Sequence, residues 1–175
     1  MVSKKPETRE TLLALFDTLG ITYTEYLHPP VFTVKEAKEP RGMIPGTHCK
    51  SLFLKAKGGA LFLIICLEWR RIDMKELANL LLSRRLSFGK PGLLMEKLGV
   101  KPGSVTPFAT INDMGSKGGH VTIVLDKKMM GYTQANYHPL INTATIGLSP
   151  QDLLCFLVTC DHTPLILDLD PVSQK

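Results

Sequence analysis

The stretch SLFLKAKGGALFLIICL, residues 51–67, contains two apolar runs separated by the triplet Lys57-Gly58-Gly59. Short runs rich in apolar and β-branched residues are typical of strands, and a brief glycine-containing connection is typical of a β-hairpin. We therefore predict antiparallel strands over residues 51–55 and 60–67. The second run is the longest apolar run of the chain and is far too short to cross a bilayer as a helix.

Helices are expected on both sides of this hairpin, because apolar residues recur at helical spacing. The pattern predicts helices over residues 8–19, from residue 73 onward, over 91–98 and from 149 to about 159. Each has a boundary residue of the appropriate type. These residues are Thr8, Asp73 (with Glu76 at capping-box spacing), Pro91 and Ser149 at the beginnings, and Gly20 and Gly99 at the ends.

Further strands are expected over residues 21–27, 105–111, 121–125 and 143–148, with an edge strand over 164–169. Helices interspersed with strands, several of them joined by hairpin-like connections, favour the α/β class. We predict a mixed, largely antiparallel and barrel-like sheet flanked by helices. Neither repeats nor linkers interrupt the 175 residues, so one domain over residues 1–175 is expected, with an ordered core of about residues 8–169.

Composition restricts the function without deciding it. The formal net charge of +5 favours a polyanionic partner but is also common in proteins that bind none. The four cysteines lack Cys-x-x-Cys spacing, and no histidine stands at zinc-finger distance from them. We expect reduced, mostly buried thiols in a cytoplasmic protein, with no metal and no cofactor. The polar N-terminal segment lacks the apolar core of a secretory signal.

Three polar islands stand at the ends of the apolar runs, at residues 46–50, 102–113 and 138–145. Their small residues, prolines, amides and hydroxyls could build a concave pocket for a small neutral group. Lys50 is either a surface lysine or a cation at the mouth of such a pocket. His138 precedes a proline, which favours an extended backbone, and is either a turn residue or a general base or hydrogen-bond anchor.

Two arginine pairs flank the helix that begins near residue 73, at residues 70–71 and 84–85. They are either solvated surface or part of a nucleic-acid-binding patch. Trp69 and Phe88 stand beside them and slightly favour nucleic acid, because exposed aromatic rings stack on bases.

Taken together, these motifs resemble the freestanding prolyl-tRNA-synthetase-associated editing domains, the YbaK-like family. The resemblance spans about residues 8–165 and depends on the order and spacing of several segments. They are HPPVFT (28–33), GTHCKSLFL (46–54), RRLSF (84–88), LGVKPGSVTPF (98–108), ND (112–113), HPL (138–140) and NTAT (142–145).

The resemblance implies hydrolysis of the ester in mischarged tRNA, with alanyl-tRNA(Pro) as the substrate of the most similar branch. It implies neither a metal nor a covalent nucleophile. The family's essential lysine corresponds to Lys50, and its substrate-carbonyl loop, Gly-x-x-x-Pro, corresponds to residues 135–139. Ser51 stands where this branch often has Asn, and Ala135 stands where the wider family has Gly. Because a glycine with positive φ is not freely replaced by alanine, the geometry of this loop is a point to test.

In this interpretation, main-chain N–H groups near residues 135–138 stabilise the oxyanion, and Lys50 neutralises the terminal phosphate or positions the adenosine. The ribose hydroxyl beside the ester helps to position the attacking water. The expected catalytic residues are Lys50, Ser51 and His138. The expected substrate-binding residues are Val31, Phe32, Thr33, Ala135, Asn136, Tyr137, Pro139, Asn142 and Thr143, of which the first three exclude proline by size. The expected tRNA-binding residues are Arg84, Arg85 and Lys90.

The expected partners are the acceptor end of mischarged tRNA(Pro) and either prolyl-tRNA synthetase or an elongation factor. No membrane partner is expected, and the chain should be a monomer or a weak dimer. Three alternatives stay open at this point. They are a deacylase for cysteinyl- or seryl-tRNA, a non-catalytic module that binds tRNA or a synthetase, and a small-ligand-binding protein indifferent to nucleic acid.

Overall fold

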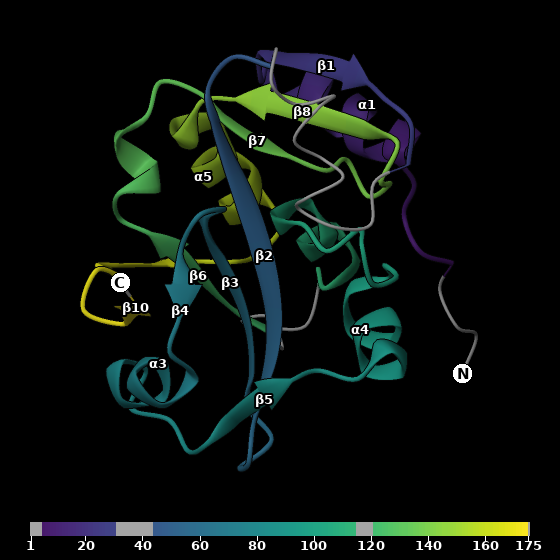
Figure 1. The fold of residues 1–175 in the computed structure, drawn as a ribbon. Coiled ribbons are helices and arrows are strands. Elements are labelled where there is room, and N and C mark those ends of the chain that lie inside the picture. Colours follow the sequence, from purple (N-terminus) through teal and green to yellow (C-terminus); the bar gives the residue numbers. More distant parts are fainter. Residues whose placement is uncertain (1–4, 31–43, 115–120, 175) are drawn as a thin grey trace.

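The computed structural model describes residues 5–30, 44–114 and 121–174. Its central feature is the predicted hairpin, formed by β2 (Thr47–Ala56) and β3 (Leu61–Leu67). The two strands pair antiparallel, with Lys50 opposite Cys66 and Leu54 opposite Phe62. All seven residues of β3 are buried, which explains why this run lacks the alternation of a half-exposed strand. β2 begins four residues earlier than predicted, at Thr47 (Figure 1).

Among the described residues, eight strands form one mixed sheet in the order β1-β8-β7-β2-β3-β6-β9, with β5 also paired to β2. The additional strands are β1 (Tyr23–Leu27), β5 (Leu86–Phe88), β6 (Val121–Asp126), β7 (Ala135–Tyr137), β8 (Ala144–Leu148) and β9 (Leu165–Leu167). The pairs β2·β7, β3·β6 and β6·β9 are parallel and the others antiparallel. The predicted mixed, largely antiparallel sheet is confirmed.

The sheet is open, so the expectation of a barrel-like sheet is corrected. Its order ends at β1 on one side and at β9 on the other. One edge of β2 pairs with β3, so β5 and β7, the other two strands that pair with β2, lie on its opposite edge. There β7 pairs with the first two residues of β2 and β5 with the last three. The sheet therefore branches along β2 instead of curling into a closed cylinder (Figure 1).

One face of the sheet is covered by α1 (Arg9–Leu19), α4 (Pro91–Leu98), α5 (Pro150–Thr159) and the short helices η1 (Pro107–Asn112) and η2 (Met129–Gly131). Phe16, Phe108 and Phe156 pack edge-to-face at the centre of this layer, with ring centroids 5.2–5.6 Å apart. The predicted helix boundaries are confirmed. Gly20 and Gly99 end their helices in the left-handed conformation, with φ of 66° and 64°.

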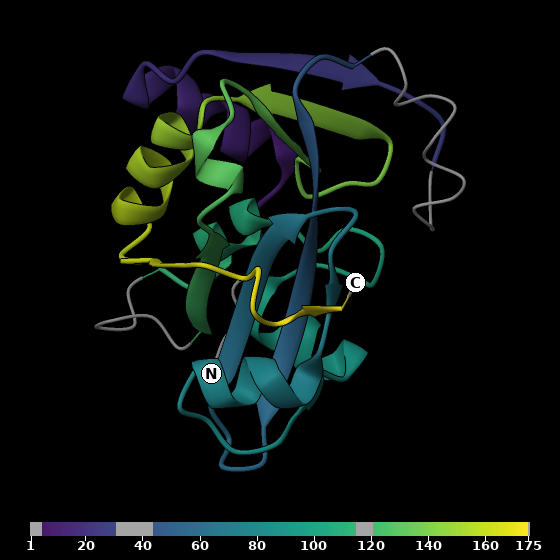
Figure 2. The same cartoon turned by 60° about the vertical axis from the view of Figure 1, so that its left-hand side comes forward.

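The other face is covered by α3 (Met74–Leu80) and the C-terminal segment, which crosses the strands (Figure 2). β10 (Ser173–Gln174) pairs with β4 (Arg71–Ile72). Ordered structure thus continues beyond residue 169, where the sequence predicts the ordered core to end. Leu169 and Val172 are buried in the second hydrophobic core, which fastens the segment to the sheet.

Residues 105–111 do not form the predicted strand, because most of this segment is the 3₁₀ helix η1. The Thr106 hydroxyl accepts a hydrogen bond from the Phe108 N–H, and Pro107 occupies the first turn, where a proline is tolerated. The short strands β4, β5 and β7 were missed, since two or three residues carry too little periodicity. In the parts of the chain that the structure describes, no helix is long and apolar enough to cross a membrane.

Candidate functional site

A small polar pocket lies where β2, β7 and β8 meet. Its lining comes from the first residues of β2, from β7 and the residue after it, and from β8. The lining residues are His48, Cys49, Asn136, Tyr137, His138 and Thr145. Strand register brings them together, because β7 pairs parallel with β2 at His48–Asn136 and antiparallel with β8 at Tyr137–Ile146.

Two amide side chains fix the floor of this pocket. Asn136 Nδ2 donates to the carbonyl oxygen of Pro45 at 2.9 Å, and Gln134 Nε2 donates to the same oxygen at 2.8 Å. This amide clamp, formed by Gln134 and Asn136, holds the turn at Gly46, whose φ is +90°. Since β2 begins directly after Gly46, the clamp positions His48 and the following residues.

His138 is oriented by the chain that leads into β8. Its Nδ1 lies 2.9 Å from the carbonyl oxygen of Ala144. A carbonyl can only accept, so Nδ1 carries the proton, and the neutral ring has its lone pair on Nε2. The ring is half-buried in the pocket wall. In this tautomer Nε2 is the acceptor nitrogen of the ring.

His28 lies close to His138, with ring centroids 6.1 Å apart. Its Nδ1 donates to the Pro29 carbonyl at 2.8 Å, and its Nε2 lies 2.9 Å from the Thr145 hydroxyl. Because Nδ1 carries the proton, the neutral ring accepts from Thr145. The His28 N–H donates to the Thr143 carbonyl at 3.0 Å, which holds the end of β1 against the turn before β8.

Sequence reasoning did not assign His28, His48 or Thr145 to the site. One signal in the sequence points to His28: like His138, it precedes a proline at the end of a strand. In the described part of the chain, no group of three or more His, Cys, Asp or Glu residues is placed to hold a metal ion.

Two pocket residues have side chains that stay neutral. Burial raises the pKa of the Cys49 thiol, and burial also holds the pKa of Tyr137 well above its ordinary value. The Tyr137 hydroxyl donates to Met129 Sδ at 3.3 Å, and its ring packs edge-to-face on Phe108. Cys49 therefore lacks the thiolate form that a nucleophile requires. The Tyr137 side chain belongs to the hydrophobic core, as does that of Ala135.

The first position of the expected carbonyl loop, residues 135–139, does not have the left-handed backbone that would require a glycine. Ala135 lies in β7 in ordinary strand geometry, so an alanine costs nothing there. The left-handed backbone falls instead on Leu140, directly after His138-Pro139, with φ of 67°. Such a conformation is uncommon for leucine and is typical of functional loops. Pro139 is buried, and Asn142 and Thr143 are half-buried in the turn that follows.

Lys50 lies near the pocket but does not line it. Its ammonium group donates to the main-chain carbonyl of Arg70. Because side chains alternate along a strand, Lys50 shares a face with His48, whereas Ser51 points to the opposite face. Lys50 thus directly follows the pocket residues His48 and Cys49 along β2, and its side chain lies on the same side of the sheet as that of His48. The structure does not bring Lys50, Ser51 and His138 to one point.

The carbonyl that holds Lys50 belongs to a buried ion-pair network. The Arg70 side chain is 1% exposed and contacts Asp126 at 2.5 Å and Asp170 at 2.7 Å. Burial opposes its charge, yet these two carboxylates leave the pKa of Arg70 above its ordinary value. The network joins β6, the C-terminal segment and the chain after β3, so the acceptor of the Lys50 ammonium is rigidly placed.

The expected tRNA-binding residues lie at the other end of β2. Arg84 and Arg85 are exposed in the connection from α3 to β5, and Lys90 is exposed before α4. β5 pairs with β2 at residues 54–56, and the pocket lies at residues 48–49. At about 3.3 Å per residue, some 20 Å of strand separates the two.

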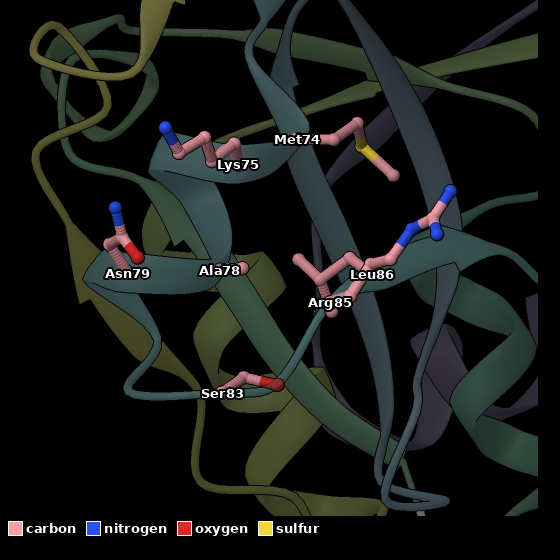
Figure 3. Close-up of a pocket in the computed structure, with 7 residues that line it drawn as sticks. All are labelled: Met74, Lys75, Ala78, Asn79, Ser83, Arg85 and Leu86. Carbon is pink, nitrogen blue, oxygen red and sulfur yellow. The ribbon is translucent and has the colours of Figure 1, made fainter.

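Arg85 also lines a larger open hollow of about 830 Å³ beside α3, together with Met74, Lys75, Ala78, Asn79, Ser83 and Leu86 (Figure 3). Neither His138 nor Lys50 reaches it. The remaining expected residues, Val31, Phe32 and Thr33, lie outside the described residues.

The comparisons identify the family to which this chain belongs. The model of the aminoacyl-tRNA editing domain matches residues 28–156. The chain belongs to this family. All six pocket residues and His28 fall within the matched range.

Relatives agree with this assignment. A Danio rerio protein named "Prolyl-tRNA synthetase associated domain-containing protein 1" is 38% identical over 166 residues, which are 94% of this chain and 89% of the relative. The "Prolyl-tRNA editing protein ProX" of Acetoanaerobium sticklandii is 33% identical over 148 residues, which are 84% of this chain and 88% of the relative. A solved structure of a candidate trans-editing enzyme for prolyl-tRNA synthetase superimposes with a TM-score of 0.68 at 22% identity, over 92% of this chain and 95% of the other, and supports the fold alone.

Proposed function

We propose that this editing domain is a deacylase that hydrolyses the ester of mischarged tRNA(Pro) in trans, with alanyl-tRNA(Pro) as its substrate. The observation that carries the proposal is that the region matching the editing-domain family contains the whole polar pocket. The 33% identity to a protein named for prolyl-tRNA editing supports the choice of tRNA(Pro).

The chemistry that the pocket must supply is modest, because an aminoacyl ester is already activated. The enzyme has to orient one water molecule and stabilise an oxyanion. In this proposal His138 Nε2 accepts a hydrogen bond from the attacking water or from the ribose hydroxyl beside the ester. The main chain at residues 137–138, just beyond the last β2–β7 residue pair, faces the developing oxyanion.

A water molecule is the proposed nucleophile. Cys49 supplies the thiol of the pocket lining, and burial raises its pKa and keeps it protonated. His28 and Thr145 act through His138 and the β8 turn: they fix the wall against which the ester lies. Both are positioning residues.

Lys50 is proposed to bind the phosphate of the terminal nucleotide. Its ammonium donates to the Arg70 carbonyl, and a four-carbon stem allows it to turn to a phosphate oxygen. Ser51, on the opposite face of β2, can contribute only from the other side of the sheet, as a hydrogen-bond partner within the layer of α4 and η1.

The preference for alanine is proposed to come from size. Favourable contact alone separates substrates that differ by a methylene by only about 1–3 kcal/mol. Exclusion of proline therefore needs a steric wall, for which we propose Val31, Phe32 and Thr33. The proposed partners are prolyl-tRNA synthetase or an elongation factor, which would deliver the mischarged tRNA in the cytoplasm.

The test is a deacylation panel of alanyl-, cysteinyl-, seryl- and prolyl-tRNA(Pro) with purified protein. We expect the highest kcat/KM for alanyl-tRNA(Pro). Lys50→Ala should remove most of the activity, with Lys55→Ala as the control, since Lys55 is an exposed lysine on the same strand. His138→Ala should lower kcat at least tenfold.

Wild-type turnover by a folded Lys50→Ala protein would refute the lysine assignment. Binding of every charged tRNA without hydrolysis would favour the non-catalytic module.

A further inference from the structure

Trp69 is an exposed aromatic ring in the turn after β3, beside the strand β2 that supplies two residues of the pocket. It is the single tryptophan of the chain and is 59% exposed. The N–H of its neighbour Glu68 donates to the carbonyl oxygen of His48 at 3.0 Å. Since His48 lines the pocket, this turn is fastened to the pocket wall.

The Trp69 ring is held in place from the protein side. The guanidinium carbon of Arg70 lies 5.0 Å from the ring centroid, a cation–π contact. Arg70 is itself 1% exposed and paired to Asp126 and Asp170, so it can meet the ring only from within the molecule. An exposed ring with a rigid support loses little conformational entropy when a flat ligand stacks on it.

Cations surround this ring. The exposed Lys128 has its Nζ 5.4 Å from the ring centroid, and the Lys50 ammonium lies on the carbonyl of the residue after Trp69. Arg71 is exposed in β4. An aromatic ring with lysine and arginine beside it is the arrangement that proteins use for single-stranded nucleic acid, in which bases stack and phosphates pair with cations.

The charges also argue against a protein partner at this point. A protein-docking surface usually has an apolar centre, whereas Trp69 stands among Glu68, Arg70, Arg71 and Lys128. Phe88, another strongly exposed ring, lies in β5 at the far end of β2 and cannot serve the same ligand base.

We propose that Trp69 is a stacking platform for one of the unpaired bases at the 3′ end of tRNA. This inference rests on the proposed function, because the ester sits on the ribose of that end. Stacking on Trp69 would place the terminal ribose over the pocket, while Lys128 and Lys50 turn from their present partners to the backbone phosphates. Trp69 is then a substrate-positioning residue that acts on binding and not on the chemical step.

The single tryptophan makes the test direct. Intrinsic fluorescence should be quenched on titration with an uncharged acceptor-stem RNA hairpin ending in CCA. The same hairpin ending in CC or C, or blunt-ended, should quench progressively less. Equal quenching by the blunt hairpin, or unquenched fluorescence while a labelled CCA hairpin binds by anisotropy, would overturn the proposal.

Variants separate stacking from structure. Trp69→Ala should raise the Kd for the labelled CCA hairpin and the KM for charged tRNA about tenfold or more, with kcat nearly unchanged. Trp69→Phe should retain most of the binding, and Tyr132→Ala is the control for loss of an exposed ring. Circular dichroism and thermal unfolding verify each fold.

The outcomes also distinguish the inference from the proposed function. Deacylation by the wild type together with an unaltered KM in Trp69→Ala would reject the platform and leave the function standing. CCA-dependent quenching in a protein that deacylates nothing would support the platform and count against the function.

Discussion

Replacing Gly147 by alanine tests the amide clamp that forms the floor of the pocket. Gly147 lies in β8 directly opposite Asn136 of β7. A Cβ at this position would approach Asn136 Oδ1 to 2.7 Å and would overlap with the amide nitrogen of Gln134. Contacts this short force the neighbouring atoms to move. The two amides would then lose their hydrogen bonds to the Pro45 carbonyl, and the turn that starts β2 would lose their support.

The cost follows from the contacts that are lost. Two hydrogen bonds to the Pro45 carbonyl and one between the amides, at 2.8, 2.9 and 3.3 Å, would break or lengthen. A hydrogen bond contributes about 1 kcal/mol and overpacking costs about 1–3 kcal/mol. We therefore expect Gly147→Ala to lower the free energy of unfolding by about 2–4 kcal/mol, a fall in Tm of about 5–15 °C for a chain of this size.

Urea and thermal unfolding, combined with deacylation of alanyl-tRNA(Pro), measure this effect. Gly92→Ala in α4 is the matched control, because an added Cβ there meets no atom within 4 Å and alanine favours a helix. The double variant Gly147→Ala with Gln134→Ala should regain part of the stability, since it removes one of the overlapping side chains. A Gly147→Ala protein within 0.5 kcal/mol of wild type, with normal activity, would refute the clamp.

The exchange of both Arg84 and Arg85 for glutamate should raise KM for tRNA more than it lowers kcat, and should weaken the salt dependence of binding; unchanged affinity would exclude this patch. Burial lowers the pKa of His162, so the unfolded chain binds a proton that the folded chain cannot. The free energy of unfolding should therefore fall as the pH drops below about 6.5, and His162→Leu should flatten this dependence in urea titrations at pH 7.5 and 5.5. A thiol reagent should modify the exposed Cys155 rapidly and the other cysteines slowly, because burial raises their pKa values, to about 11 for Cys66; Cys155→Ser should remove the rapid phase, and four equal rates would contradict the burial.

Local features of the sequence were enough to predict the hairpin and the helices. The apolar runs around residues 57–59 and the caps at Thr8, Gly20 and Gly99 act within a few residues of the chain. Helix periodicity and capping geometry depend on neighbours along the chain, so both can be recognised in the amino-acid sequence alone. Residues 105–111 are an apolar run whose pattern fits a strand, yet most of it forms a 3₁₀ helix. The reason is that Thr106 and Pro107 favour a helical turn and that Phe108 is buried between Phe16 and Phe156.

The sequence by itself was enough to predict the central hairpin, the α-helices and the longer strands, and its motifs named Lys50 and His138 as candidate residues. Only the tertiary structure decided which residues share the pocket. His28 and Thr145 are 117 residues apart and meet through the pairing of β1 with β8, and Cys49 meets Tyr137 through the pairing of β2 with β7. Neighbours in a strand always point to opposite faces, but the pairing of the strands decides which face of the sheet Lys50 takes and which one Ser51 takes. Contacts of this kind depend on how distant strands align, and a shift by one residue would reverse every face, so no local pattern in the chain records them.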